Sequence, residues 1–189
     1  MTKTSPSLVI TVEVPAERDD RRDRELFGLL ARGDSGALGD IYDRHAAPLF
    51  RHALALTRQA ADAEDLVQAA FVKLASMGAL LLGVRKPASY LHRMLRAAWI
   101  DLQRRRGTSG EQSIAGDPLA PAAADADAVI DIRRALATLP EDQREVVVLH
   151  VFNGFSFREI GNISGVSTFT AASRYRLGIG RLRRWLGEP

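Results

Sequence analysis

The chain has 189 residues, of which 46% are hydrophobic and 26% are charged, and it contains no cysteine. This composition predicts one or two small globular domains. The absence of cysteine excludes disulfides and cysteine-ligated zinc sites and fits a reducing compartment.

The net charge of +3 is unevenly distributed along the chain. Residues 25–106 hold 12 basic and 8 acidic side chains, and residues 132–189 hold 9 and 5. Residues 107–131 between them hold 5 acidic side chains and no basic one. Two basic segments that flank an acidic connector are typical of a two-module nucleic-acid-binding protein, because each basic module gains from releasing phosphate counterions.

Residues 1–24 are predicted to form a flexible tail, because they include most of the mixed-charge run RDDRRDRE that starts at Arg18. The early apolar stretch Leu8 to Val14 is short and is interrupted by Thr11 and Glu13. No membrane-spanning segment or export signal is therefore predicted. We expect a cytoplasmic protein without a membrane partner.

Residues 25–106 show helical periodicity and are predicted to form the first helical domain. One of its helices begins near Asp62 and has a regular apolar stripe: Ala63, Leu66, Val67, Ala70 and Leu74. Three side chains project away from that stripe and are candidates for a protein-docking surface: Asp65, Gln68 and Val72. An ordinary solvated face with one exposed valine is the alternative explanation.

The last helix of this domain begins at Pro87 and is predicted to bury one apolar face, made of Leu91, Met94, Leu95, Ala98, Trp99 and Leu102. Its opposite face carries Arg93, Arg96, Ala97, Ile100 and Arg104, and Arg105 and Arg106 follow. Arginines along one helical ridge could track a phosphate backbone. Arginines at a helix end also interact favourably with the helix dipole and need no ligand for that.

Residues 107–128 are rich in Gly, Ser, Ala, Pro and Asp and are predicted to form a flexible linker. Residues 129–189 then form a second helical domain, with helices over 129–139 and 141–152. The core beneath its last two helices is predicted to contain Val146, Val147, Leu149, Val151 and Phe152.

The end of the chain is predicted to form a helix-turn-helix. Ser156 and Glu159 have the spacing of a capping box at the start of a helix over about 156–163. Gly165 can adopt the positive φ that a sharp turn requires, and Ser167 is a suitable N-cap for the second helix. The expected buried stripe of that second helix is Phe169, Ala172, Tyr175, Ile179, Leu182 and Leu186.

Residues on or near the other side of this helix are candidate DNA contacts: Ser167, Thr170, Ser173, Arg174, Arg176, Arg181 and Arg184. Arginines can bind phosphates or guanine edges, and small hydroxyls suit phosphate or base-edge contacts. Gly161, Gly178 and Gly180 weaken the prediction, because an interior glycine costs a helix about 1 kcal/mol relative to alanine. A solvated amphipathic helix in a bundle is the alternative.

These motifs resemble the extracytoplasmic-function group of sigma-70 family sigma factors, the promoter-recognition subunits of bacterial RNA polymerase. In the first domain the similarity lies in AEDLVQ at residues 63–68 and in Pro87, Tyr90, Leu91 and Arg93, followed by Arg104 to Arg106. In the second domain it lies in LPxxQREV, which starts at Leu139, and in the helix-turn-helix. Both motifs occur in the family's order, separated by a polar linker.

The resemblance implies an all-α fold of two small helical domains and a sigma factor without catalytic, cofactor or metal sites. It implies that Asp65, Gln68 and Val72 bind the clamp coiled coil of the largest polymerase subunit, and that the flap of the second-largest subunit is a further contact. The minus-ten element would be bound by Arg93, Arg96, Ala97, Arg104 and Arg105, together with the loop 77–88. The second domain would bind the minus-thirty-five duplex, and an anti-sigma factor is expected.

The chain departs from the residues usual in that family at several of these positions. Ala69 replaces a frequent glutamate, Ala97 an asparagine, Ala172 a lysine, and Leu80 to Leu82 a polar loop. A helix-turn-helix regulator that never joins polymerase is the first alternative, and an interaction protein with a degenerate helix-turn-helix is the second. An enzyme is the third, with acid-base or metal groups drawn from His45, His52, His92, His150, Asp43 and Asp101.

Overall fold

The computed structural model of the chain describes residues 19–109 and 126–186, and all regular secondary structure in these ranges is helical. The predicted all-α fold is therefore confirmed. The N-terminal unit contains α1 (Asp20–Ala31), α2 (Gly36–Thr57), α3 (Ala60–Ala75), the 3-10 helix η1 (Gly78–Gly83) and α4 (Pro87–Ser109). The C-terminal unit contains α5 (Ala126–Ala137), α6 (Glu141–Val147), the π-helical turn η2 (Val148–Phe152), α7 (Phe157–Ser164) and α8 (Thr168–Trp185).

The first helix begins inside the segment that was predicted to be a flexible tail, so the expected boundary at residue 24 is wrong. The side chain of Asp19 caps α1 by accepting a hydrogen bond from the backbone N–H of Arg22 at 3.0 Å. The buried carboxylate of Asp23 accepts from Nε of Arg44 at 2.8 Å and lies 3.1 Å from Nε2 of His45, both in α2. The mixed-charge run therefore places two acidic residues, Asp20 and Asp23, in the first turn of α1, where they interact favourably with the helix dipole. Asp23 also attaches α1 to α2. The Leu8 to Val14 stretch lies outside the described residues.

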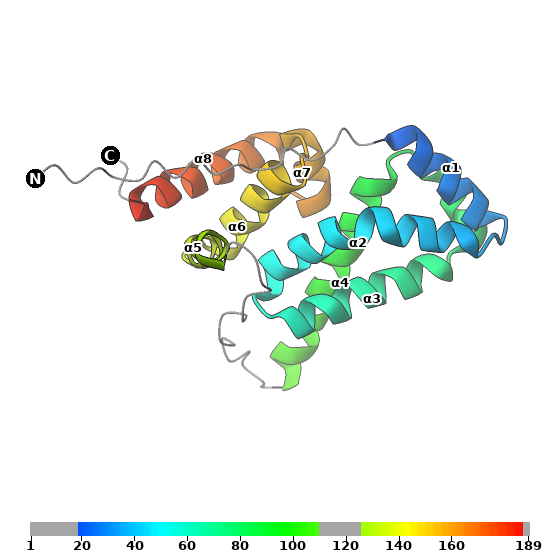
Figure 1. Cartoon of the computed structure of the whole chain (residues 1–189), viewed down its shortest axis with the longest axis horizontal. Coiled ribbons are helices and arrows are strands. Elements are labelled where there is room, and N and C mark those ends of the chain that lie inside the picture. The colour runs from blue at the N-terminus through cyan, green and yellow to red at the C-terminus, as the bar shows by residue number, and fades with distance from the viewer. Residues whose placement is uncertain (1–18, 110–125, 187–189) are drawn as a thin grey trace, which may run out of the picture.

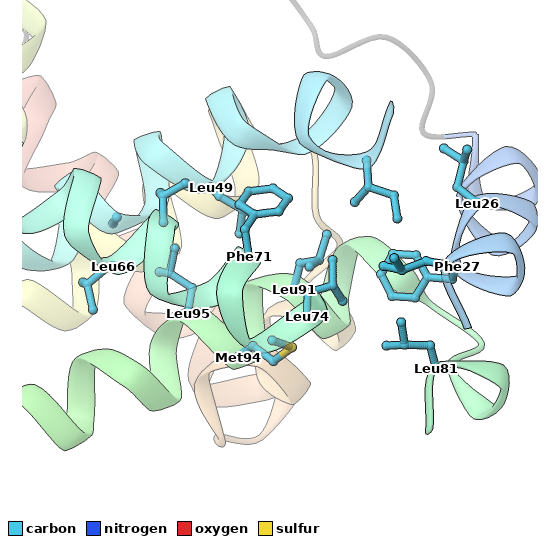
Figure 2. Packing of buried hydrophobic residues seen from close by; sticks show 14 of the residues in the cluster. Leu26, Phe27, Leu49, Leu66, Phe71, Leu74, Leu81, Leu91, Met94 and Leu95 are labelled. Atoms are coloured by element: carbon cyan, nitrogen blue, oxygen red, sulfur yellow. The ribbon is translucent and has the colours of Figure 1, made fainter. Parts of the chain in front are cut away.

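The core of the N-terminal unit is formed where α1 to α4 converge (Figure 2). The stripes predicted for α3 and α4 both face this core, where Leu74, Leu91 and Leu95 are fully buried. Leu81 anchors η1 at the end near Leu26 and Phe27 of α1 (Figure 2). Leu80 and Leu82, on either side of Leu81, remain 73% and 63% exposed. Burial of the large apolar side chains thus fixes the position of α4 and of the loop before it.

A smaller core holds the helix-turn-helix together, and it includes a residue from the other unit. Val146 and Leu149 pack with Phe155, Ile160, Ile163 and Ala171. Ala88, from the first turn of α4, is buried in the same cluster. Val147 is also buried, whereas Val151 and Phe152, which were predicted to be core residues, are half-buried.

The two units pack against each other (Figure 1). Helix α4 contacts α7, and α2 contacts α6 and η2. Helix α8 begins beside α7 and runs away from the N-terminal unit (Figure 1). Residues 107–109, expected to belong to the linker, extend α4, and α5 begins at Ala126 instead of residue 129. Most of the predicted linker, residues 110–125, lies outside the described residues.

Candidate nucleic-acid interface

The helix-turn-helix has the local geometry that its sequence predicts. The hydroxyl of Ser156 accepts from the N–H of Glu159 at 3.4 Å, and the Glu159 carboxylate accepts from the N–H of Ser156 at 3.0 Å. Gly165 ends α7 with φ +70°, in the left-handed region. Ser167 caps α8 by accepting from the N–H of Thr170 at 3.0 Å. These bonds satisfy backbone donors at both helix starts and fix the direction in which α8 leaves the turn.

Two of the glycines that appeared unfavourable are required by close packing. A Cβ atom on Gly161 would lie 2.7 Å from the carbonyl oxygen of Val166, so a side chain there would collide with the turn. A Cβ atom on Gly178 would lie 2.9 Å from Cγ2 of Val147 in α6. A Cβ atom on Gly180 would meet nothing within 4 Å. Of these three glycines, therefore, only Gly180 lowers the stability of its helix relative to alanine without being required by packing.

Helix α8 buries a different face from the one predicted. Its buried residues are Ala171 and Gly178, and Tyr175 packs partly against the same core. Phe169 and Leu186, expected in the buried stripe, are 76% and 40% exposed. Small residues form the contact because α6 and α7 approach α8 closely. A face made of small residues cannot be predicted from the periodicity of large apolar side chains.

The predicted DNA contacts of α8 therefore fall into two groups. Arg176, Arg181 and Arg184 are exposed, as is Ser167 at the start of the helix. Thr170 and Ser173 are half-buried, and Ser173 accepts from a terminal nitrogen of Arg176 at 3.3 Å.

Arg174 was expected on the outer face and lies instead beside α6. Its Nε is 3.1 Å from Oδ2 of Asp142, and its side chain is only 26% exposed. The one-residue shift of the buried face explains this placement, because residue 174 follows Ala171 by about one turn and so faces α6.

The second cationic surface follows α4, with the side chains largely where the sequence predicts them. Arg93, Ala97, Arg104 and Arg105 are exposed. The guanidinium carbon of Arg93 lies 5.3 Å from the ring centroid of Tyr90. A terminal nitrogen of Arg104 is 2.8 Å from Asp101. Arg106 forms two hydrogen bonds of 2.9 Å with Asp62 of α3, so it fixes the end of α4 against the bundle.

Arg96 is the exception on this surface, because a carboxylate of the other unit holds it. Its Nε donates to Oε1 of Glu145 in α6 at 2.9 Å, and its side chain is 25% exposed. Glu145 is 2% exposed and lies 3.2 Å from Nε2 of His52 in α2. Nδ1 of His52 lies 3.0 Å from Nδ1 of His92 in α4. Three helices from both units thus meet in one buried polar network.

The network is chemically consistent with an ionised Glu145. The carboxylate can accept from the guanidinium of Arg96 and from Nε2–H of His52. Burial raises the pKa of Glu145, but the hydrogen bond and charge of His52 and the charge of Arg96 outweigh burial and leave the pKa below its ordinary value. Glu145 therefore has Arg96 and His52 as partners only while the units are together.

Further hydrogen bonds between the units surround this network. The Nε of Arg144 in α6 donates to the carbonyl of Ala55 in α2. Asn153 donates to the carbonyl of Pro48 at 3.0 Å and accepts from Arg51 at 3.1 Å. At the other edge, Trp99 donates to Glu141 at 3.2 Å, and Lys86 lies 2.9 Å from the capping-box residue Glu159.

Helical periodicity does not predict this interface, although the sequence contains a signal for it. Arg144 and Glu145 directly precede the run VVVLHV, and His52 lies between the apolar residues Leu49 and Leu56. Charged or polar side chains at core positions are rare unless they are paired. These polar residues indicate a buried contact, but the sequence does not show which residues they contact.

The residues predicted to bind polymerase are exposed on α3, and two of them border an apolar hollow. Val72 is 65% exposed, and Asp65 and Gln68 are also exposed. The hollow lies between α2 and α3, and its lining is mostly apolar: Leu38, Tyr42, Ala46, Ala47, Phe50, Glu64, Val67, Gln68, Phe71, Val72 and Ala75. Asp65 is not part of this lining.

The histidines considered for an enzyme have structural partners. His45 lies against Asp23, His52 and His92 join the interface network, and Nδ1 of His150 bonds to the carbonyl of Phe155 at 2.8 Å. Within residues 19–109 and 126–186, no cluster of His, Asp and Glu side chains could hold a metal ion.

In the same ranges no helix is both long enough and apolar enough to span a bilayer.

Comparison with known proteins places both units in one family of transcription proteins. Residues 41–108 match the model of sigma-70 region 2, and residues 130–182 match that of sigma-70 region 4. The ECF RNA polymerase sigma factor SigM of Mycobacterium tuberculosis is 30% identical over 171 residues, which cover 90% of this chain and 87% of SigM. The RNA polymerase sigma factor CarQ of Myxococcus xanthus is 34% identical over 161 residues, 82% of this chain and 92% of CarQ.

Two solved structures have a similar fold. The sigma factor RpoE from Bartonella quintana, in complex with the anti-sigma factor NepR, matches with a TM-score of 0.65 and 28% identity. That match covers 78% of this chain and 97% of RpoE. CnrH, in complex with the cytosolic domain of CnrY, matches with a TM-score of 0.62 and 25% identity over 87% of this chain and 97% of CnrH.

Proposed function

Since the chain belongs to the extracytoplasmic-function group of sigma-70 family sigma factors, we propose that it joins core RNA polymerase and directs it to promoters by binding two separate DNA elements. Sigma factors are transcription initiation factors and not enzymes, so the protein acts by binding. The observation that carries the proposal is the presence of two exposed arginine surfaces, one on α4 and one on α8.

The C-terminal unit would bind the upstream minus-thirty-five element as duplex DNA. The start of α8 is rigidly set by the cap at Ser167 and by the tight packing at Gly161. The exposed side chains of Arg176, Arg181 and Arg184 would then lie along the phosphate backbone. A helix held this firmly at its N-terminal end suits the insertion of that end into a major groove.

The N-terminal unit would bind one strand of the minus-ten element. Helix α4 exposes Arg93, Arg104 and Arg105. The preceding helix η1 exposes two apolar side chains, Leu80 and Leu82. Removing a base from the stack costs a few kcal/mol, which backbone contacts and a surface for the base can offset. No hydrolysis is needed for this step.

Full use of the α4 surface would require the two units to separate. Arg96 was expected to contact the minus-ten element, but Glu145 occupies its Nε in the packed arrangement. A phosphate can replace that carboxylate, since both are anionic acceptors for a guanidinium. We therefore propose that the structure represents the sigma factor before it engages a promoter.

Polymerase would bind the exposed side of α2 and α3. The hollow bordered by Gln68 and Val72 is apolar, and Tyr42 at its edge is 50% exposed. Exposed apolar surface of this kind marks protein-binding sites. The clamp coiled coil of the largest subunit is the proposed partner here, and the flap of the second-largest subunit is the proposed partner of the C-terminal unit.

An anti-sigma factor is the proposed inhibitor. Both similar structures contain a partner chain: RpoE is bound to the anti-sigma factor NepR, and CnrH to the cytosolic domain of CnrY. An inhibitor that stabilises contacts between the units would keep Arg96 paired with Glu145.

In vitro transcription with purified core polymerase and a library of genomic promoters tests the central proposal. We expect specific start sites that appear only when the full-length protein is added. DNA binding that is equally strong without polymerase and gives no start sites would support a conventional helix-turn-helix regulator instead. Neither transcription nor DNA binding would indicate an interaction protein.

A further inference from the structure

The first turn of α8 exposes a large aromatic side chain where DNA contact is proposed. Phe169 is 76% exposed, more than the other large apolar residues on this helix. Keeping a phenylalanine in water forgoes most of the stabilisation that its burial would give. The residue also lies at the N-terminal end of the second helix of the helix-turn-helix, the end that contacts base edges in proteins with this motif.

The residues around Phe169 form a short apolar strip within a polar surface. Ala172 follows it by three positions on the same side of the helix and is half-buried. Ser173 and Arg176 continue this side, where the Arg176 guanidinium donates to the Ser173 hydroxyl at 3.3 Å. No long or charged side chain rises from position 172, so Phe169 and Ala172 give this side of the helix two apolar side chains one turn apart.

We propose that Phe169 and Ala172 select thymine in the upstream element by apolar contact with its C5-methyl group. This inference rests on the proposed function. The methyl of thymine is the apolar group that a base pair presents in the major groove, and alanine and phenylalanine are among the side chains that contact it. Specificity at this position would come from contact with a methyl group and not from a hydrogen bond.

The charge of α8 favours DNA over a protein as the occupant of this strip. The helix carries five arginines and no acidic residue. Arg176, Arg181 and Arg184 are exposed on it, so the strip lies within a positive field that attracts a phosphate backbone. The strip is short, as contact with one or two base pairs requires.

The first experiment compares the base preferences of the full-length protein and a variant, each bound to core polymerase. The template is a promoter identified by transcription, with its upstream element randomised, and bound duplexes are selected and sequenced. The wild-type protein should select thymine at one or two adjacent positions. Phe169→Ala should lose that preference and keep the preferences at the remaining positions.

The second experiment removes the methyl group from the DNA. Replacing the selected thymine with deoxyuridine keeps the base pair and its hydrogen bonds but deletes the C5-methyl. Wild-type holoenzyme should bind the deoxyuridine duplex about fourfold more weakly, the change expected for one buried methyl-sized group. Phe169→Ala should bind both duplexes equally, which identifies the methyl as the partner of the ring.

Leu177→Ala is the matched control, since Leu177 is 58% exposed on the same helix but further from its N-terminal end. It should keep both the thymine preference and the fourfold effect. Circular dichroism should show unchanged helix content for both variants, because neither side chain is buried. Identical preferences for Phe169→Ala and wild type, or a deoxyuridine effect that persists in Phe169→Ala, would overturn this inference and leave the sigma-factor proposal intact. Failure of the wild-type holoenzyme to select any upstream sequence would overturn both.

Discussion

Arg96 of α4 and Glu145 of α6 form an ion pair of 2.9 Å that joins the N-terminal and C-terminal units. Arg96 lies on the surface proposed for the minus-ten strand, while Glu145 belongs to the unit proposed for the upstream duplex. The pair therefore connects the two proposed activities in a single contact. Because Glu145 also accepts from His52, its removal would leave both a guanidinium and a buried imidazole without their partner.

Glu145→Ala should loosen the packing of the two units. Removing one partner of a buried ion pair costs about 3–5 kcal/mol, an upper bound here because the side chain of Arg96 is 25% exposed. Small-angle X-ray scattering should show a larger radius of gyration, and the thermal midpoint should fall. Asp101→Asn removes an exposed pair with Arg104 and should change stability by less than about 1 kcal/mol. An unchanged radius in Glu145→Ala would mean that this pair does not hold the units together.

Acid should weaken the packing of the units through the same carboxylate. Burial works against ionisation, but His52 and Arg96 keep the folded-state pKa of Glu145 below its ordinary value. The resulting stabilisation is fully present above the unfolded-state pKa of about 4.3 and is lost as pH falls through the lower folded value. Thermal unfolding between about pH 7 and pH 3 measures the loss.

Asp23 contributes to the same acid sensitivity, which makes a variant necessary to separate the two groups. Burial raises its pKa, but His45 and Arg44 outweigh this and leave the pKa lowered. Glu145→Gln should therefore retain the part of the pH dependence that is due to Asp23 and lose the part that is due to Glu145. A pH profile identical to that of the wild type would show that Glu145 does not contribute.

The two interior glycines of α8 should respond in opposite directions to alanine. Gly178→Ala would place a Cβ atom 2.9 Å from Val147 and should destabilise the protein by about 1–3 kcal/mol through overpacking. Gly180→Ala would meet nothing within 4 Å and should stabilise it by about 1 kcal/mol through helix propensity. Chemical denaturation of both variants measures the difference. Equal effects would mean that α8 is not packed on α6 as described.

An acidic side chain at position 72 should impair polymerase binding without unfolding the protein. Val72 is 65% exposed at the border of the hollow between α2 and α3, so Val72→Glu should leave the thermal midpoint unchanged. A charge at a desolvated contact should weaken binding to core polymerase by at least about tenfold, or 1.4 kcal/mol. Leu82→Glu makes the same kind of change at a residue that is 63% exposed on η1 and should not weaken binding. Equal losses in the two variants would argue against this surface.

The ends of the helices in the helix-turn-helix could be predicted because their causes are local. Ser156 and Glu159 are three residues apart and Gly165 ends the same helix, so short-range spacing contained the necessary information. The core-facing residues of α3 and α4 followed from helical periodicity in the same way. The resemblance to sigma factors also came from short motifs, and the comparisons confirmed it.

The packing of the units could not be predicted, because its partners are distant in sequence. His52 and Glu145 are separated by 93 positions, and nothing near either residue specifies the other. The buried face of α8 was predicted wrongly for a different reason. Ala171 and Gly178 make the contact, and small residues carry little weight in a hydrophobic pattern, whereas the conspicuous Phe169 is exposed.

The neighbouring arginines of α8 should differ in what their removal affects. Arg174 pairs with Asp142 at 3.1 Å, so Arg174→Ala should lower the thermal midpoint by disturbing the contact between α6 and α8. Arg176 is exposed, so Arg176→Ala should leave the midpoint unchanged and weaken binding of the holoenzyme to upstream duplex. Loss of one phosphate contact should also reduce the slope of log affinity against log salt by about 1. If Arg174→Ala instead weakens DNA binding at unchanged stability, Arg174 must leave Asp142 when the sigma factor binds its promoter.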